Sequence, residues 1–216
     1  MTLSCACTRL TELKITDRDR EQWRCYLEPA RQAFVSQHSC SISPIVYDDM
    51  VVLGNDQGDE NHAGASSVLA VDHRDGALRW KLERRTATVA YSTPCVYRPP
   101  GGQPELIFNS EAHGVTSIDP ASGQVNWEVS VFKKRSVSST VIACGLILGS
   151  CGSGGGGSYL VAVRPPSDVE SSPSIAYKLE SSTPYVPTPL ALGELAFVWS
   201  HTGIVTCVRA ATGATL

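Results

Sequence analysis

The sequence predicts an all-β fold, a series of small antiparallel sheets, because two short patterns recur about every 45 to 50 residues, a period typical of stacked structural units. The first pattern is an apolar stretch that ends in Asp and leads through a Gly turn to Trp, at 69–80 and again at 117–127. The second is a strand start of small residues, at 43–47, 93–97 and 188–190. A β-sandwich is not expected to repeat the same turn chemistry at the same offset.

The first unit shows the predicted strand order. Residues 45–47 and 50–53 flank an Asp-Asp pair, which predicts a tight hairpin. Residues 68–71 form a third apolar run, and residues 78–82 alternate in polarity as a fourth strand. The sequence therefore predicts a partial β-propeller of about four four-stranded antiparallel blades, since propeller blades are about 40 to 50 residues long. The predicted blades cover 41–85, 90–131, 137–180 and 186–216.

Residues 1–31 differ from the rest and are interpreted as an N-terminal extension or as the remnant of a preceding blade. A charge-dense stretch from Thr16 to Trp23 is compatible with a short helix that has Thr16 as its N-cap. The alternative is the outer strand of a blade. We favour the strand, because Trp23 precedes a blade start much as Trp80 and Trp127 do.

The repeated turn and aromatic residues are predicted to be structural. An Asp before such a turn accepts hydrogen bonds from the turn's own amides, Gly supplies the positive φ, and Trp packs against the neighbouring blade or braces the turn. In the third unit, Arg164 followed by Pro165 and Pro166 replaces the Asp, and Tyr177 holds the place of Trp. The predicted structural residues are Asp72, Gly76, Trp80, Asp119, Gly123, Trp127 and Gly213.

Composition limits the partners. The chain has 216 residues, 42% hydrophobic and 18% charged, enough for one sizeable core, and its net charge of −3 does not favour nucleic acid as a partner. No apolar stretch approaches the ~20 residues of a membrane span. Residues 1–9 lack the apolar core of a signal peptide.

Eight cysteines are present, without a C-x-x-C pair or a zinc-finger His spacing, and the sequence does not choose among their disulfide connectivities. Cys95, Cys144 and Cys207 lie in apolar, strand-like runs, which predicts buried free thiols. The run 152–157 is Gly-rich but has no following Lys-Ser or Lys-Thr, which favours a hairpin loop over a phosphate loop.

The pattern Ala70-x-Asp72-x-x-x-Gly76-x-x-x-Trp80, echoed at 118–127 and 209–213, resembles the tryptophan-docking repeat of PQQ-like (quinoprotein alcohol dehydrogenase-like) β-propellers. Strings at 34–38, 105–110 and 185–190 resemble the BamB-like and planctomycete type of these repeat proteins. The resemblance covers about 32–216. It implies a ring of seven or eight blades, of which this chain holds about half, and an extracytoplasmic or periplasmic location.

Enzymatic members of that superfamily hold PQQ and calcium beneath an adjacent Cys-Cys pair, and no two cysteines are adjacent here. The chain also lacks a G-x-S-x-G elbow. We therefore expect no catalytic residue, no cofactor and no metal. Under the alternative, the chain is a fragment of a PQQ-dependent oxidoreductase that binds PQQ with calcium.

In a four-stranded blade, the loop between the second and third strands shares a face with the loop that leads to the next blade. This face is predicted to bind an anionic ligand or an acidic protein segment, with a solvated charged rim as the alternative. The two histidines in it belong to blades that are not neighbours and are interpreted as polar turn residues. The candidate ligand-binding residues are Arg84, Arg85, Glu111, His113, Lys133, Lys134, Arg135 and His201.

The function expected from the sequence is a non-enzymatic scaffold that binds a protein partner or a small anionic ligand. A half propeller leaves two blade faces uncovered, and such apolar faces favour association. We therefore expect a second copy, or another protein, to complete the ring.

Overall fold

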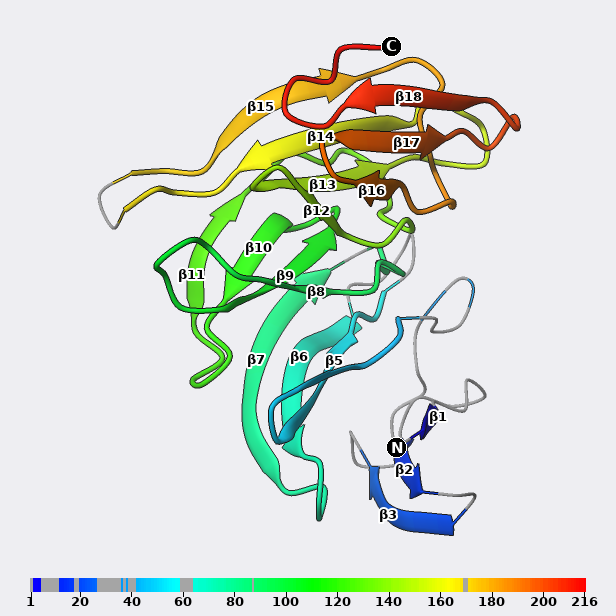
Figure 1. Ribbon diagram of the computed structural model, residues 1–216. Coiled ribbons are helices and arrows are strands. Elements are labelled where there is room, and N and C mark those ends of the chain that lie inside the picture. The colour runs from blue at the N-terminus through cyan, green and yellow to red at the C-terminus, as the bar shows by residue number, and fades with distance from the viewer. Residues whose placement is uncertain are drawn as a thin grey trace. The chain divides into compact units, whose positions relative to one another are not determined.

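The computed structural model describes residues 2–4, 12–17, 20–26, 36, 38, 42–58, 64–86, 88–168 and 171–216. These residues form strands arranged in five antiparallel sheets, and none of them lies in a helix (Figure 1). The predicted all-β class is confirmed. The chain divides into two compact units, Met1–Val89 with Pro120–Gln124, and Ala90–Asp119 with Val125–Leu216.

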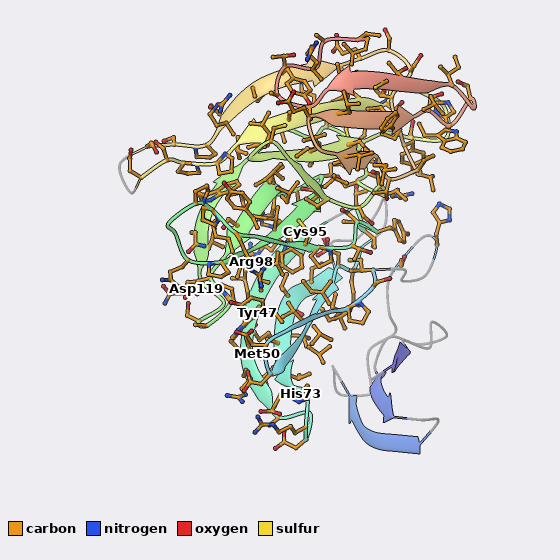
Figure 2. All side chains as sticks on the ribbon, viewed as in Figure 1. Tyr47, Met50, His73, Cys95, Arg98 and Asp119 are labelled. Atoms are coloured by element: carbon orange, nitrogen blue, oxygen red, sulfur yellow. The ribbon has the colours of Figure 1, made fainter. Side chains whose placement is uncertain are left out.

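Unit 1 contains a three-stranded and a four-stranded sheet, each with its strands in sequence order. The hairpin of the larger sheet turns at Asp48, whose φ of 48° fits a tight turn, and Tyr47 pairs with Met50 across it (Figure 2). The next strand is buried along its whole length. The strands are β1 (Thr2–Ser4), β2 (Glu12–Asp17), β3 (Arg20–Tyr26), β4 (Ile45–Tyr47), β5 (Met50–Asn55), β6 (Gly64–Asp72) and β7 (Leu78–Thr86).

Unit 2 contains three sheets, two with four strands and one with three. An isolated antiparallel bridge pairs Val208 of the last strand with Thr215. The first sheet contains β8 (Cys95–Tyr97), β9 (Glu105–Ser110), β10 (Gly114–Ile118) and β11 (Val125–Val129). The second contains β12 (Val141–Ala143), β13 (Leu146–Cys151), β14 (Tyr159–Arg164) and β15 (Ser174–Leu179), and the third β16 (Leu190–Leu192), β17 (Leu195–Trp199) and β18 (Val205–Arg209).

The repeat is visible in the strand register. In each four-stranded sheet, the aromatic residue of the fourth strand pairs with a residue of the third strand. The register between these two strands shifts directly after that residue of the third strand. The pairs are Ala70 with Trp80, Ser117 with Trp127, and Ala162 with Tyr177. Such a bulge bends the outer strand at the same point in every sheet.

Residues 12–26 follow the same pattern. Ile15 pairs with Trp23 immediately before a register shift between β2 and β3. The helical alternative for the stretch from Thr16 to Trp23 is therefore wrong, because its backbone pairs with a neighbouring strand.

The middle sheet of unit 2, β12–β15, is packed on both faces. Leu148 and Leu160 belong to a cluster with Val198 of the last sheet. Ile147 and Val161 belong to a second cluster with residues of β9 and β10. Because side chains alternate between the faces of a strand, one sheet serves two cores.

The cysteine prediction was partly wrong. Cys144 is exposed because it is the first residue of the hairpin turn between β12 and β13, where its φ is 50°. Cys95 and Cys207 are partly buried, and Cys151 is fully buried; all four thiols are free. Burial raises the pKa of Cys95 to about 12.

Candidate functional site

The predicted cations Lys133, Lys134 and Arg135 lie in the loop between β11 and β12, in unit 2. The Lys133 backbone N–H donates to Tyr159 Oη over 2.8 Å, and that hydroxyl donates to the carbonyl of Val131 over 3.0 Å. One tyrosine hydroxyl therefore fixes the loop on both sides of Phe132, which is itself buried. Lys133 is exposed.

The same loop is attached to the Gly-rich segment 152–157. Lys134 Nζ donates to the carbonyl of Gly156 over 2.9 Å, and the Gly152 N–H donates to the carbonyl of Arg135 over 3.0 Å. Gly157 has a φ of +69°, which favours Gly, and a Cβ added there would lie 2.4 Å from Lys134 Nζ, so the ammonium group would have to move. The Gly-rich segment therefore serves as a hairpin loop that accepts bonds from the basic loop.

Two further contacts complete a cluster of cations. The Arg135 guanidinium carbon lies 5.6 Å from the centre of the Tyr91 ring, and Lys178 Nζ lies 4.2 Å from that of Tyr159, within cation–π range. Lys178 also pairs with Glu180 at 2.5 Å. We call Lys133, Lys134, Arg135 and Lys178 the basic cluster.

Tyr159 is held in its protonated form. Burial has the largest effect on its pKa, followed by a hydrogen bond with Cys151 and by the charge of the Cys151 thiolate. Together they raise the pKa of Tyr159 to about 12. The negative charge of Glu111 adds a smaller contribution. The phenol therefore donates its hydrogen bond at every physiological pH, and Glu111 lies close enough for its charge to act on this tyrosine.

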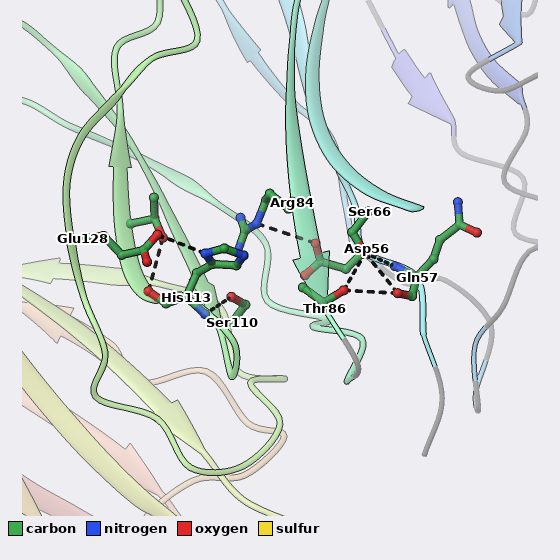
Figure 3. Close-up of polar contacts among 9 residues, drawn as sticks. Asp56, Gln57, Ser66, Arg84, Thr86, Ser110, His113 and Glu128 are labelled. Atoms are coloured by element: carbon green, nitrogen blue, oxygen red, sulfur yellow. Dashed lines mark hydrogen bonds and ion pairs between the residues drawn. The ribbon is translucent and has the colours of Figure 1, made fainter. Parts of the chain in front are cut away.

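The two predicted histidines are not brought together. His113 Nδ1 lies 3.1 Å from Glu128 Oε2, and the His113 N–H donates to Ser110 Oγ over 3.1 Å (Figure 3). His201 is exposed in the turn between β17 and β18. Each imidazole is part of its own hairpin turn.

Arg84 and Arg85 belong to unit 1. Arg84 is not a rim cation: its Nε lies 3.9 Å from Asp56 Oδ1, and the two side chains are 4% and 3% exposed (Figure 3). Beside this pair, Ser66 Oγ lies 2.5 Å from Thr86 Oγ1 and donates to the carbonyl of Gln57. Arg85 is exposed.

The predicted structural residues make the contacts of turns. Asp72 Oδ1 accepts from the Arg74 N–H over 2.8 Å, and its Oδ2 pairs with Arg79. Both bonds lower the pKa of Asp72 below its ordinary value, and the bond from Arg74 has the larger effect. The φ angles of Gly76, Gly123 and Gly213 are 75°, 72° and 74°.

The aromatic residues differ from one another. Trp80 Nε1 donates to the carbonyl of Pro120 over 2.8 Å, within unit 1, and Tyr177 Oη donates to that of Ala210 over 2.8 Å, within unit 2. In contrast, Trp127 Nε1 donates to Glu105 Oε2, 2.9 Å away in its own sheet. Asp119, before the turn, is half-buried.

Sequence reasoning missed Tyr91, Tyr159 and Lys178. The contacts of Tyr159 with the basic loop join residues more than about 25 positions apart, and no local pattern reports such contacts. A weak signal was available: Tyr159 lies two residues after the Gly-rich segment, where a bulky side chain reaches the neighbouring loop.

The described residues contain no group of three or more His, Cys, Asp or Glu side chains arranged to hold a metal ion. Within the same part of the chain, no helical segment has the length and apolarity of a membrane span.

The bulged four-stranded sheets, their aromatic residues and their Gly turns define a PQQ-like β-propeller repeat protein. The chain belongs to the family described as outer membrane protein assembly factor BamB, whose model matches residues 31–216. No curated protein matches the sequence.

Three solved structures share the fold. The crystal structure of BamB from Moraxella catarrhalis superposes with a TM-score of 0.66 at 14% identity, over 100% of this chain and 60% of that one. Quinohemoprotein alcohol dehydrogenase ADHIIG from Pseudomonas putida HK5 gives 0.58 at 12% identity, over 94% of this chain and 47% of that one. The computationally designed protein Ika4 gives 0.52 at 10% identity, over 82% of this chain and 98% of that one. The chain thus spans less than two thirds of BamB and about half of the dehydrogenase.

Proposed function

We propose that this chain is a non-enzymatic propeller scaffold whose basic cluster binds an acidic segment of a protein partner. The family is described as outer membrane protein assembly factor BamB, and this description supports a role in protein assembly rather than in catalysis. By the same relationship, we place the protein outside the cytoplasm.

The observation that carries this proposal is the fixed basic loop. Lys133 is exposed, while its backbone is hydrogen-bonded to Tyr159 and the flanking Lys134 and Arg135 are held by Gly156 and Tyr91. A charged loop that is already ordered loses little conformational entropy on binding.

The arrangement favours an extended segment over a small anion. Lys134, Arg135 and Lys178 each contact a different partner, namely Gly156, Tyr91 and Glu180. Their charges therefore lie beside separate partners, two of them in the loop after β11 and one on β15, and an extended acidic chain meets separate charges better than a compact anion does.

Anisotropy of a fluorescein-labelled peptide of alternating Glu and Gly tests the proposal. We expect saturable binding that weakens with added salt, and a loss of about tenfold in affinity in Lys133→Glu, because a like charge replaces the exposed cation. Arg209→Glu, an equal charge change at the exposed last residue of β18, should bind as the parent does. Equal losses in both variants, or no binding by the parent, would refute the proposal.

The alternative, a fragment of a PQQ-dependent oxidoreductase, is supported by the fold shared with the quinohemoprotein dehydrogenase. The described residues fit the cofactor poorly, since the free thiols Cys95, Cys144, Cys151 and Cys207 are not adjacent in sequence. Calorimetric titration with PQQ and CaCl₂ separates the two functions. Near-stoichiometric binding would favour the oxidoreductase.

We further propose that a second copy of the chain covers the last sheet. Leu190, Leu192 and Trp199 of this sheet are 65%, 67% and 55% exposed, and Val205 is 48% exposed. Apolar residues exposed together on one sheet favour association. Light scattering of the purified chain is expected to give the mass of a dimer, and a stable monomer would contradict this proposal.

A further inference from the structure

The loops at one end of the sheets in unit 2 depart from the repeat in two places. In the sheets β4–β7, β12–β15 and β16–β18, short turns at 48–49, 144–145 and 193–194 join the first and second strands, whereas β8 and β9 are joined by residues 98–104, which begin at Arg98 (Figure 2).

The second departure lies in the next sheet. The third and fourth strands are joined by residues 73–77 in the first four-stranded sheet and 119–124 in the second, but by residues 165–173 between β14 and β15. In repeat proteins, insertions of this kind gather on one face, which is often the binding face.

Both insertions line the same pocket. The cavity has a volume of about 680 Å³, which is in the range of small-ligand sites. Its wall is formed by residues 99–104 of one insertion, by 166–168 and Ser171 of the other, and by Glu105, Asp119, Asn126 and Trp127. All of these residues belong to unit 2.

Internal hydrogen bonds fix both walls. In one insertion the Gly102 N–H donates to the carbonyl of Pro99 over 3.1 Å. In the other, the Ser171 N–H donates to Asp168 Oδ1 over 2.8 Å, and the Ser167 N–H donates to Ser171 Oγ over 2.8 Å. The proline residues stiffen the chain further, so the pocket is formed before a ligand arrives.

The chemistry of the pocket is aromatic and acidic. Glu105 accepts from Trp127 Nε1 at 2.9 Å and from Ser117 Oγ at 2.5 Å, and both donors are neutral. Both bonds use Oε2, and Oε1 has no partner in the described part of the chain. Asp119 and Asp168 add two carboxylates, and none of the described lining residues is Lys, Arg or His.

We propose that this pocket binds an organic cation, a guanidinium or alkylammonium group, with Trp127 as its aromatic wall and Glu105 as its counter-charge. Trp is the best aromatic partner for a cation, and a carboxylate at the same wall adds a charge-assisted hydrogen bond. An arginine side chain of a partner protein offers the positive charge and the N–H donors, and a small quaternary ammonium compound offers the positive charge alone. The site is separate from the basic cluster: Glu105 begins β9, and the turn with Glu111 follows the other end of that strand.

The test uses the intact chain and the indole N–H resonance of Trp127, assigned by its loss in Trp127→Phe. N-acetyl-arginine amide is the protein-like probe, choline is the small-molecule probe, and N-acetyl-citrulline amide is the neutral control with nearly the same shape as arginine. We expect a saturable shift with at least one cation and none with citrulline. The cation that binds more tightly identifies the source of the ligand.

Two charge-removing variants locate the site. Glu105→Gln keeps an acceptor for Trp127 and is expected to weaken cation binding about tenfold, since it loses the counter-charge. Glu111→Gln removes the same charge beyond the other end of β9 and should leave the affinity unchanged. An equal shift with citrulline, unchanged affinity in Glu105→Gln, or no saturable shift with either cation would overturn the proposal.

Discussion

Trp80 and Trp127 occupy the same position in the repeat but have different surroundings. The Trp80 ring is 8% exposed, and a Cβ on Gly123 would lie 2.5 Å from it. Trp127 is half-buried, bonds to Glu105 in its own sheet, and lines an open pocket. The strand register fixes the position of the aromatic residue in the sheet. The loop that packs against this residue determines whether it is buried in the core or lines a surface pocket.

Tyr177 supports this interpretation because it behaves as Trp80 does. Its hydroxyl donates to the carbonyl of Ala210, and a Cβ on Gly213 would lie 2.5 Å from its ring. Trp80 and Tyr177 each pack against the Gly of a repeat turn, Gly123 and Gly213 respectively. The loop beside Trp127 instead contains Pro165 and Pro166 in place of that turn.

The largest effect is expected for Gly123→Ala. The added Cβ would overlap the Trp80 ring, and φ of +72° is unfavourable for Ala, so we expect a loss of about 3 kcal/mol in the free energy of unfolding, measured with urea. Gly101→Ala is the matched control, because its φ is also +72° and its Cβ would meet nothing within 4 Å. This variant should lose only about 1 kcal/mol. Equal losses would show that the ring contact contributes nothing.

A smaller effect separates the two tryptophans. Trp80→Phe leaves the buried carbonyl of Pro120 without its donor and should cost about 1 to 2 kcal/mol. Trp127→Phe should cost about 0.5 kcal/mol, because water replaces the indole N–H at the partly exposed Glu105. The same urea titration checks both values, and a larger loss in Trp127→Phe would reverse the comparison.

The smallest effect concerns alkaline pH. The pKa of Tyr177 is raised to about 12, above its ordinary value of 10, mainly by burial and to a smaller extent by the charge of Cys144. A raised pKa stabilises the fold fully below pH 10, and this contribution is lost as the pH rises from 10 through 12. Tyr177→Phe should therefore unfold with a flatter pH dependence over this range, measured by thermal melting. Tyr47→Phe serves as the control, and an identical slope in the parent and Tyr177→Phe would contradict the prediction.

The strands and Gly turns were predictable from the sequence because their signals are local. Gly76, Gly123 and Gly213 each end the same short motif, and the structure gives each a positive φ. The burial of Arg84 in β7 was not predictable, because its partner Asp56 lies far away in the sequence, in the connection between β5 and β6. Cys144 was expected to be buried because apolar residues lie on both sides of it, but it occupies the hairpin turn between β12 and β13 and is exposed.

The pocket beside Trp127 shows the same limit. The replacement of the turn by Pro165 and Pro166 is visible in the sequence, and so is the Pro-rich segment 99–104. Their meeting at one cavity depends on the packing of neighbouring sheets, which no single segment encodes.

The two-sided packing of the middle sheet also orders the local unfolding of unit 2. The amide hydrogens of β13 and β14 lie between two cores, so solvent reaches them only after a whole sheet has separated. In the single chain, the last sheet, β16–β18, has apolar residues open to water on one side and should release its amides first. A protease that cuts the exposed turn at 201–203 therefore attacks the part of unit 2 that opens most often, while β12–β15 survives as the slowest-exchanging element.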